Sequence, residues 1–442
     1  MTTKAGRTAP IENALRDVHQ RFRARFPASA SQFEDACQAL PGGNTRTVLF
    51  YTPFPLTFIS GEGAYLTDLD GHRLIDFVSE QTAALYGHSH PAIITAIQGA
   101  LSSGLTLGGP NRYEAELAEL LCARFPSIDL VRFCNSGTEA NLLALATARA
   151  VTGRPRILVF EGGYHGSLLQ FSTPPSPINA PFDQAVLPYN DTAQAVELIE
   201  REGESFAAIL VEPMMGAAGC IPAAPEFLAG LREASDRRGV ILIFDEVMTS
   251  RLSASGLQGS IGVTPDLTTL GKYVGGGLSF GAFGGRRDIM ERFDPRRPDR
   301  FNHPGTFNNN TLSMAAGLAG LRDVYTESEA TAFNARGDKL RVRLNQIFLD
   351  RMLPAQVTGV GSLMNLHFTD TRIEQAADAR RSDSRLRELV HLELLLNGLF
   401  TARRGFIALS LPLTTSEFDR LTAALAALAD QWSPLLGSDD KK

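Results

Sequence analysis

The feature that most constrains the fold of this chain is a series of short apolar runs that alternate with helical segments from about residue 90 onward. The runs at 156–160, 208–211 and 240–244 are rich in branched residues and bounded by Gly, Pro or charged residues. Such continuously apolar runs are typical of strands inside a mostly parallel sheet that is covered by helices. The pattern therefore predicts an α/β domain.

The length of the chain predicts a second domain. A chain of 442 residues exceeds what one hydrophobic core usually organises. Beyond about residue 315, long helical patterns alternate with short apolar strands, which is typical of a smaller α+β domain. We expect a large domain over 76–315, a C-terminal small domain over 316–442, and an N-terminal segment, 1–75, that contributes to the small domain.

Composition and charge exclude several classes of protein. Hydrophobic residues make up 44% of the chain and charged residues 20%, the balance of a globular protein. The net charge is 42 − 48 = −6, without a Lys/Arg block, so nucleic acid is not an expected partner. No stretch has the length or apolarity of a signal peptide or a membrane span, and we expect a cytoplasmic protein without membrane contact.

The cysteines and two neighbouring histidines do not indicate a metal site. Cys37, Cys122, Cys134 and Cys220 are scattered, without a CxxC pair or a histidine at zinc spacing, and are interpreted as buried free thiols. His88 and His90 lie in a turn motif, 86–91, and are interpreted as structural. No metal is expected.

Three motifs carry the chemistry. Ser136-Gly137-Thr138 follows an apolar strand and opens a helix, where free N–H groups and the positive end of the dipole attract an anion such as a phosphate. The alternative is a plain helix cap. Asp245 ends an apolar strand, at the edge where α/β sheets bind ligands, and a carboxylate there needs a partner. The alternative is a helix cap or a structural salt bridge.

The third motif is Lys272, between Leu270-Gly271 and Tyr273. Lysine is scarce in this chain: three of the others lie in terminal tails, and Lys339 lies on a charged helical face. Lys272 alone has an apolar, glycine-rich setting, in which desolvation favours the neutral amine that Schiff-base chemistry needs.

A phosphate cradle, a buried acid and a sheltered lysine together are the contacts that pyridoxal phosphate (PLP) requires for its phosphate, its pyridinium nitrogen and its aldehyde carbon. Tyr164, in the Gly-rich segment 162–166, could supply an aromatic face for the ring; the alternative is a packing tyrosine in a turn. The three motifs therefore predict a PLP enzyme.

The order of these motifs resembles that of the class III aminotransferases, of the fold-type I PLP family, over nearly the whole chain. The matching segments are 86–91, 135–141, 162–166, 211–213, 244–247, 270–273 and 305–308. Within the class, the segments 41–50, 248–252, 305–310 and 404–406 resemble the aromatic β-amino-acid aminotransferases. This resemblance implies a large domain with a mostly parallel sheet and a smaller α+β domain.

The resemblance also implies roles for particular residues. Lys272 and Asp245 would be catalytic, and the cofactor would be held by Ser136, Gly137, Thr138, Tyr164, Glu212, Asp245, Val247, Lys272 and Thr306. Thr306 would reach the phosphate of a neighbouring subunit, which implies a homodimer with shared active sites. Arg46 and Arg404 would bind substrate carboxylates; without the resemblance, both would be interpreted as surface salt-bridge residues.

The function implied is transfer of the amino group of (S)-aromatic β-amino acids, such as 3-amino-3-phenylpropanoate, to 2-oxoglutarate or pyruvate by a ping-pong mechanism. The partners would be a small amino donor and a keto-acid acceptor. The alternative enzymes on the same scaffold are a glutamate-1-semialdehyde 2,1-aminomutase and a general ω-amine transaminase. A catalytically silent PLP-binding protein is a third hypothesis, against which the complete set of Lys272, Asp245 and phosphate cradle argues.

Overall fold

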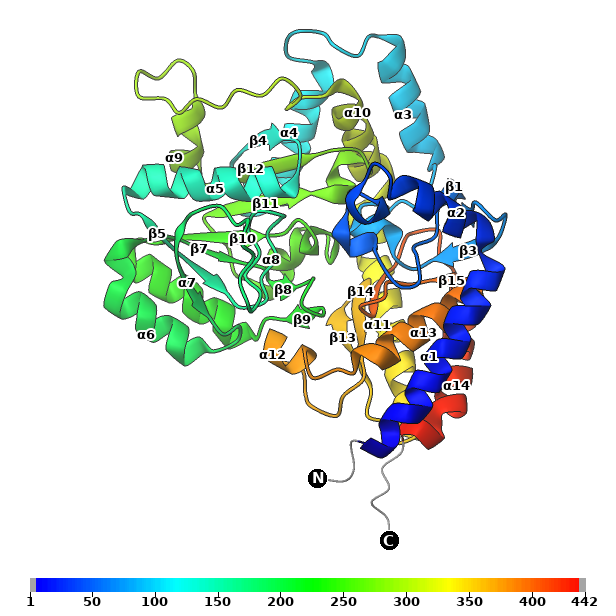
Figure 1. Ribbon diagram of the computed structural model, residues 1–442. Coiled ribbons are helices and arrows are strands. Elements are labelled where there is room, and N and C mark those ends of the chain that lie inside the picture. Colours follow the sequence, from blue (N-terminus) through cyan, green and yellow to red (C-terminus); the bar gives the residue numbers. More distant parts are fainter. Residues whose placement is uncertain (1–4, 437–442) are drawn as a thin grey trace.

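The computed structural model describes residues 5–436 of the chain, built around a seven-stranded sheet (Figure 1). The strands lie in the order β4-β12-β11-β10-β7-β5-β6. β12 is antiparallel to β4 and β11, and the other four pairs are parallel, so the sheet is mostly parallel, as predicted. The strands are β4 (Leu130–Cys134), β5 (Arg156–Phe160), β6 (Asp183–Leu187), β7 (Phe206–Val211), β10 (Ile241–Asp245), β11 (Leu267–Gly271) and β12 (Gly281–Gly285).

Both faces of the central strands of this sheet are buried, which explains the continuously apolar runs. In β5, Leu158 and Phe160 pack into one hydrophobic cluster with residues of α6 (Thr192–Glu202) and α7 (Pro225–Arg238). Ile157 and Val159 point the other way, into a second cluster with α5 (Gly137–Thr152). Figure 1 shows α5 on one side of the sheet and α6 and α7 on the other.

The remaining strands form smaller sheets outside the large one. One has the order β1-β2-β3-β15, made by β1 (Phe58–Glu62), β2 (Tyr65–Asp68), β3 (Arg73–Asp76) and β15 (Leu399–Phe400). Another has the order β13-β14-β16, made by β13 (Gln356–Val360), β14 (Leu363–His367) and β16 (Phe406–Ala408), and β8 (Met214–Met215) pairs with β9 (Ile221–Pro222). Because β15 pairs with β3, the two ends of the chain share a sheet; the domain boundaries at residues 75 and 315 stay a prediction.

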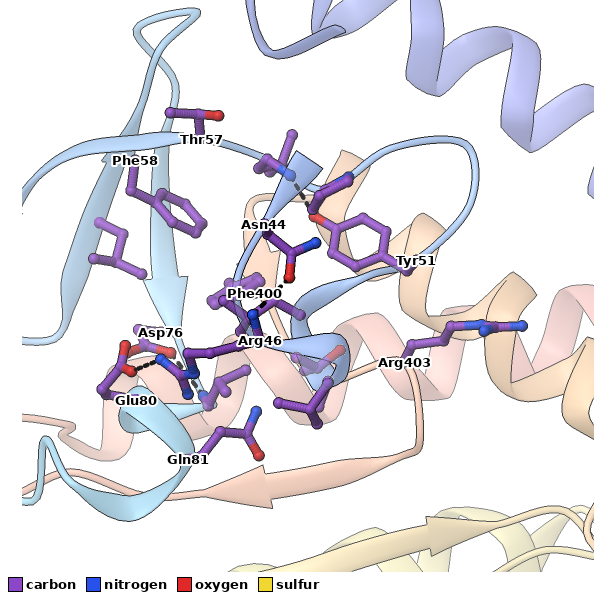
Figure 2. Close-up of a pocket in the computed structure, with 18 of the residues that line it drawn as sticks. Asn44, Arg46, Tyr51, Thr57, Phe58, Asp76, Glu80, Gln81, Phe400 and Arg403 are labelled. Carbon is purple, nitrogen blue, oxygen red and sulfur yellow. Dashed lines mark hydrogen bonds and ion pairs between the residues drawn. The ribbon is translucent and has the colours of Figure 1, made fainter. Parts of the chain in front are cut away.

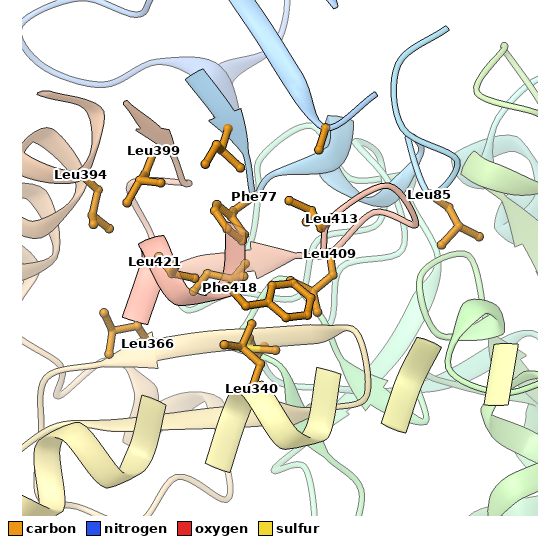
Figure 3. Packing of buried hydrophobic residues seen from close by; sticks show 14 of the residues in the cluster. Phe77, Leu85, Leu340, Leu366, Leu394, Leu399, Leu409, Leu413, Phe418 and Leu421 are labelled. Carbon is orange, nitrogen blue, oxygen red and sulfur yellow. The ribbon is translucent and has the colours of Figure 1, made fainter. Parts of the chain in front are cut away.

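Helices complete both parts of the molecule. Those not yet given are α1 (Ala5–Arg25), α2 (Pro27–Ala36), α3 (Pro91–Ser102), α4 (Arg112–Arg124), α8 (Gly256–Ile261), α9 (Arg287–Met290), α10 (Thr311–Ala319), α11 (Glu327–Asp350), α12 (Ala376–Ala379), α13 (Ser384–Leu396) and α14 (Thr415–Leu436). Helix α1 runs beside α13 and α14 (Figure 1). Figure 3 shows the core that joins the ends of the chain, where Phe77 lies with Leu399, Leu409 and Phe418.

Within the described residues, no helix combines the length and the apolarity that crossing a membrane requires. In the same part of the chain, no cluster of three or more His, Cys, Asp or Glu side chains is arranged to hold a metal ion. All four cysteines are free thiols, and Cys134 and Cys220 are buried as expected, but Cys122 is only partly buried and the expectation is wrong for Cys37, which is exposed. It directly follows the last residue of α2, at a helix end that faces solvent.

Candidate active site

A cavity of about 280 Å³ lies at the ends of β10 and β11, beside the start of α5. Eight of the nine residues predicted to hold the cofactor line it: Ser136, Gly137, Thr138, Tyr164, Glu212, Asp245, Val247 and Lys272. They come from separate loops that follow different strands, and the parallel arrangement brings those loops to one edge of the sheet. The structure thus brings together the predicted phosphate cradle, acid and lysine.

The first turn of α5 forms one wall of the cavity. Ser136 is the N-cap of this helix, and its Oγ accepts a hydrogen bond from the amide of Glu139 at 3.1 Å. The first amides of a helix have no intrahelical acceptor and face an anion readily. Gly137 packs closely on Val247, because a Cβ added to it would lie 2.8 Å from both Val247 methyl carbons. Thr138 Oγ1 accepts from the amide of Ser167 at 3.3 Å.

Asp245 lies at the C-terminal end of β10 and is 5% exposed. Its Oδ2 accepts a hydrogen bond from Asn141 Nδ2 at 2.8 Å and lies 2.8 Å from His165 Nδ1, while its Oδ1 accepts from the amide of Val247 at 3.0 Å. Thr269 in turn donates to Asn141 Oδ1 at 2.7 Å and orients that amide. The donors hold the carboxylate in one orientation beside the cavity.

Lys272 follows β11 directly, with a φ of 54° that places its backbone in the left-handed region. Burial lowers the pKa of Lys272 to about 8, against the opposing effect of the Asp245 and Glu212 carboxylates. A larger fraction of this amine is therefore unprotonated near neutral pH than for an exposed lysine. This is the protonation state that a nucleophilic amine needs.

Glu212 and Tyr164 form a further wall. Glu212 is 5% exposed, and its carboxylate accepts from the amides of Tyr164 at 3.1 Å and Gly216 at 2.9 Å. Burial, together with the negative charge of Asp245, raises the pKa of Glu212. The Tyr164 side chain lines the cavity and is 44% exposed.

Thr306 is the one predicted cofactor residue that does not line this cavity. Its side chain is exposed, and it precedes Phe307, which is 61% exposed. Its predicted contact with the phosphate of a neighbouring subunit stays a prediction.

The two predicted substrate arginines lie in different surroundings. Arg46 lines a separate cavity of about 350 Å³, where it forms an ion pair with Glu80 (Figure 2). Arg404 stacks on Phe406, with its guanidinium carbon 4.8 Å from the ring centroid, and donates to Gln81 Oε1 at 2.8 Å. Burial lowers the pKa of Arg404, whereas Cys220, Tyr164 and Glu212 oppose this shift. Neither arginine lines the cofactor cavity, and each contacts a residue of the same turn, Glu80 or Gln81.

Two residues that hold the acid, His165 and Asn141, were not predicted from the sequence. Both lie inside segments that were singled out for other reasons, 162–166 and 135–141. A buried carboxylate at the end of an apolar strand requires polar partners, and that requirement was the available signal. Sequence alone does not tell which of many polar residues meets it.

The fold and this cavity define a PLP-dependent aminotransferase, and the chain belongs to the class III aminotransferase family, whose model matches residues 50–429. The chain is 51% identical over 428 residues to the β-phenylalanine transaminase of Variovorax paradoxus, which covers 97% of this chain and 98% of that one. The structure of a β-phenylalanine aminotransferase from the same organism matches with a TM-score of 0.95 at 51% identity, covering 96% of this chain and 99% of that chain.

Two further relatives extend the comparison. A transaminase with PLP bound matches with a TM-score of 0.86 at 31% identity, covering 93% of this chain and 99% of that chain. The glutamate-1-semialdehyde 2,1-aminomutase of Thermomicrobium roseum is 39% identical over 429 residues, covering 91% of this chain and 98% of that one. The chain shares the fold of fold-type I PLP transferases, and its cofactor is PLP.

The residues of the cavity fit this cofactor. The amides at the start of α5 suit a phosphate, the buried Asp245 suits a protonated ring nitrogen, and the Lys272 amine suits an aldehyde carbon. The close contact between Gly137 and Val247 leaves no room for a side chain at the cradle.

Proposed function

We propose that this aminotransferase moves the amino group of (S)-aromatic β-amino acids, such as 3-amino-3-phenylpropanoate, to 2-oxoglutarate or pyruvate by a ping-pong mechanism. The observation that carries the proposal is the presence of two arginines, Arg46 and Arg404, each held by a residue of the same turn, Glu80 and Gln81. The 51% identity to a β-phenylalanine transaminase supports the choice of donor.

Bound PLP supplies an electron-withdrawing ring and a carbon that accepts the amino group. The amides at the start of α5 would bind its phosphate, and Tyr164 and Val247 would hold its ring. Asp245 keeps a proton on the ring nitrogen, because a buried carboxylate stabilises a cation beside it. Lys272 Nζ, as the free amine, removes the proton from the substrate carbon that bears the amino group.

Two arginines could bind substrate carboxylates at two different distances from the reacting carbon, as this reaction requires. In a β-amino acid, the reacting carbon lies one bond further from the carboxylate than in an α-keto acid. One site must therefore bind carboxylates at two different distances from the reacting carbon. An arginine can bind a carboxylate through two parallel hydrogen bonds. We assign the donor carboxylate to Arg46 and the α-carboxylate of the acceptor to Arg404.

The two half-reactions, measured separately in the pre-steady state, test this assignment. Arg46→Ala should slow deamination of 3-amino-3-phenylpropanoate and spare amines without a carboxylate, whereas Arg404→Ala should mainly impair 2-oxoglutarate. Loss of a charged hydrogen-bond partner costs about 1.5–3 kcal/mol, which corresponds to about a ten- to hundredfold loss in one half-reaction. An unchanged β-amino-acid half-reaction in Arg46→Ala would contradict the proposed substrate and favour a general ω-amine transaminase.

A glutamate-1-semialdehyde 2,1-aminomutase is the second candidate, because a mutase of this kind is 39% identical to the chain. A mutase returns the amino group to the same molecule, whereas an aminotransferase consumes a second keto acid. Stoichiometric consumption of 2-oxoglutarate or pyruvate during turnover of 3-amino-3-phenylpropanoate would exclude the mutase. A screen of α-, β- and ω-amino donors against both acceptors then identifies the preferred pair.

A further inference from the structure

The turn that holds both arginines has an unusual backbone. Four consecutive non-glycine residues, Ser79 to Thr82, have positive φ values of 47°, 48°, 53° and 84°. Non-glycine residues are sterically strained in this region, and such conformations persist where surrounding contacts hold them. The turn therefore places the Glu80 and Gln81 side chains at a cost in backbone energy.

Buried contacts fix the turn at both ends. Asp76 Oδ1 accepts from the amides of Val78 at 2.7 Å and Ser79 at 3.0 Å, and Ser79 Oγ donates to the carbonyl of Ala408 at 2.9 Å. At the other end, the fully buried Arg251 donates to the carbonyl of Thr82 at 3.3 Å. Glu80 and Gln81 lie between these fixed points.

The two central residues meet the two arginines with different charges. Glu80 offers a carboxylate to Arg46, and both side chains of this pair are substantially exposed, at 54% and 42% (Figure 2). Gln81 offers a neutral amide oxygen to Arg404. A substrate carboxylate that binds Arg46 must displace another carboxylate, whereas at Arg404 it displaces a neutral group.

We propose that Glu80 and Gln81 are specificity-determining positioning residues: Glu80 occupies Arg46 as an internal carboxylate until a substrate carboxylate displaces it, and Gln81 orients Arg404 without competing for its charge. This inference rests on the proposed function. An amine without a carboxylate leaves the Arg46–Glu80 pair intact and does not expose an uncompensated arginine. The Arg46–Glu80 pair therefore lets one site accept donors with and without a carboxylate. It weakens binding of donors that have a carboxylate, because these must displace Glu80.

A reciprocal exchange of charge tests the proposal. Glu80→Gln removes the competing carboxylate and should lower the KM for 3-amino-3-phenylpropanoate about two- to fivefold, the range expected for an exposed ion pair, with kcat unchanged. The KM for 1-phenylethylamine should not fall. Gln81→Glu introduces a competing carboxylate at Arg404 and should raise the KM for 2-oxoglutarate, again with kcat unchanged. Both changes keep the side-chain length, and neither introduces a glycine that would relax the turn.

Glu197→Gln is the matched control, because it removes the acid of an exposed ion pair with Arg201 on α6 and should change neither KM. Unchanged KM values in both Glu80→Gln and Gln81→Glu would overturn the inference, as would an equal change for both donors. If Glu80→Gln does not fold, the KM of Gln81→Glu for 2-oxoglutarate still tests the inference. Arg46→Ala separates the two proposals: an effect of Arg46→Ala without an effect of Glu80→Gln contradicts only this inference, whereas no effect of Arg46→Ala contradicts the proposed substrate itself.

Discussion

At Lys272, burial and the neighbouring carboxylates shift the pKa of the amine in opposite directions. Burial lowers the pKa of its amine to about 8, while Asp245 and Glu212 favour the charged form. The burial effect is the larger, so the amine loses its proton more readily than an ordinary lysine, whose pKa is about 10.4. The burial that the apolar and glycine-rich sequence provides therefore favours the nucleophilic form of the amine that we propose for Lys272.

The pH dependence of cofactor uptake tests this preparation. Only the free amine bonds to the aldehyde, so the rate at which apoenzyme takes up PLP should rise about tenfold per pH unit below about pH 8 and level off above it. A rate that keeps rising beyond about pH 10, as for an ordinary lysine, would contradict the lowered pKa. Stopped-flow absorbance measures the rate. Lys272→Ala is the control and should yield no borohydride-stable adduct and no turnover.

Asp245→Asn tests the role of the acid. A neutral amide should still bind some cofactor but should not keep the ring nitrogen protonated. Removing one partner of a buried charged pair costs about 3–5 kcal/mol, so most of the activity should disappear. The measurement is kcat, with cofactor content determined by absorbance on the same sample. Near wild-type kcat at full occupancy would count against the assignment.

At the scale of elements, three ends of regular structure make the cofactor cavity: the start of α5 and the ends of β10 and β11. The helix contributes its first amides. Strand β10 contributes its last residue, Asp245, and Lys272 directly follows β11. Close packing makes this arrangement depend on a glycine, because Gly137 meets Val247 where the helix begins.

Gly137→Ala tests that dependence. The added Cβ would lie 2.8 Å from the Val247 methyl carbons, and overpacking of this kind costs about 1–3 kcal/mol. We expect the affinity of apoenzyme for PLP to fall about tenfold, measured by fluorescence titration. Gly99→Ala in α3 is the matched control, because a Cβ there meets nothing within 4 Å, and it should leave the affinity unchanged. An equal affinity in both variants would refute the packing argument.

At the scale of the whole molecule, the proposed second subunit would lie against exposed residues around Thr306. Thr306 and Phe307 are exposed next to Asn309, whose side chain donates to the carbonyl of Gly109 at 3.3 Å. The nearby Leu105 and Leu107 are 48% and 52% exposed. Large exposed apolar side chains that gather on one surface mark interfaces. We propose that this surface forms a homodimer in which Thr306 reaches the phosphate site of the other subunit.

Subunit exchange tests the shared site. Mixed dimers of Lys272→Ala and Thr306→Ala should regain activity, because one site then collects both defects and the other has none. Activity of the mixture is compared with that of each parent, and mass spectrometry of the intact dimers verifies exchange. No regain despite verified exchange would place Thr306 in the site of its own subunit.

The amino-acid sequence by itself determined the class of fold and the chemical centre. Strands buried on both faces must be apolar at nearly every position. The runs at 156–160, 208–211 and 240–244 can therefore be recognised as buried strands from the sequence alone. The scarcity of lysine singled out Lys272, and a carboxylate at the end of an apolar strand singled out Asp245. These signals are local, because burial restricts the residue type that each individual position tolerates.

The tertiary structure alone decided which side chains meet. Arg46 and Glu80 are 34 positions apart, Arg404 and Gln81 are 323 apart, and Asp245 lies 80 positions from His165. A sequence carries no local signal for such pairs, since contact depends on how the whole chain is traced and on a turn whose backbone no propensity favours. The tertiary structure identified Glu80 and Gln81 as the partners of the two arginines, because it brings the two ends of the chain into one sheet. The difference in charge between these two partners follows from that contact.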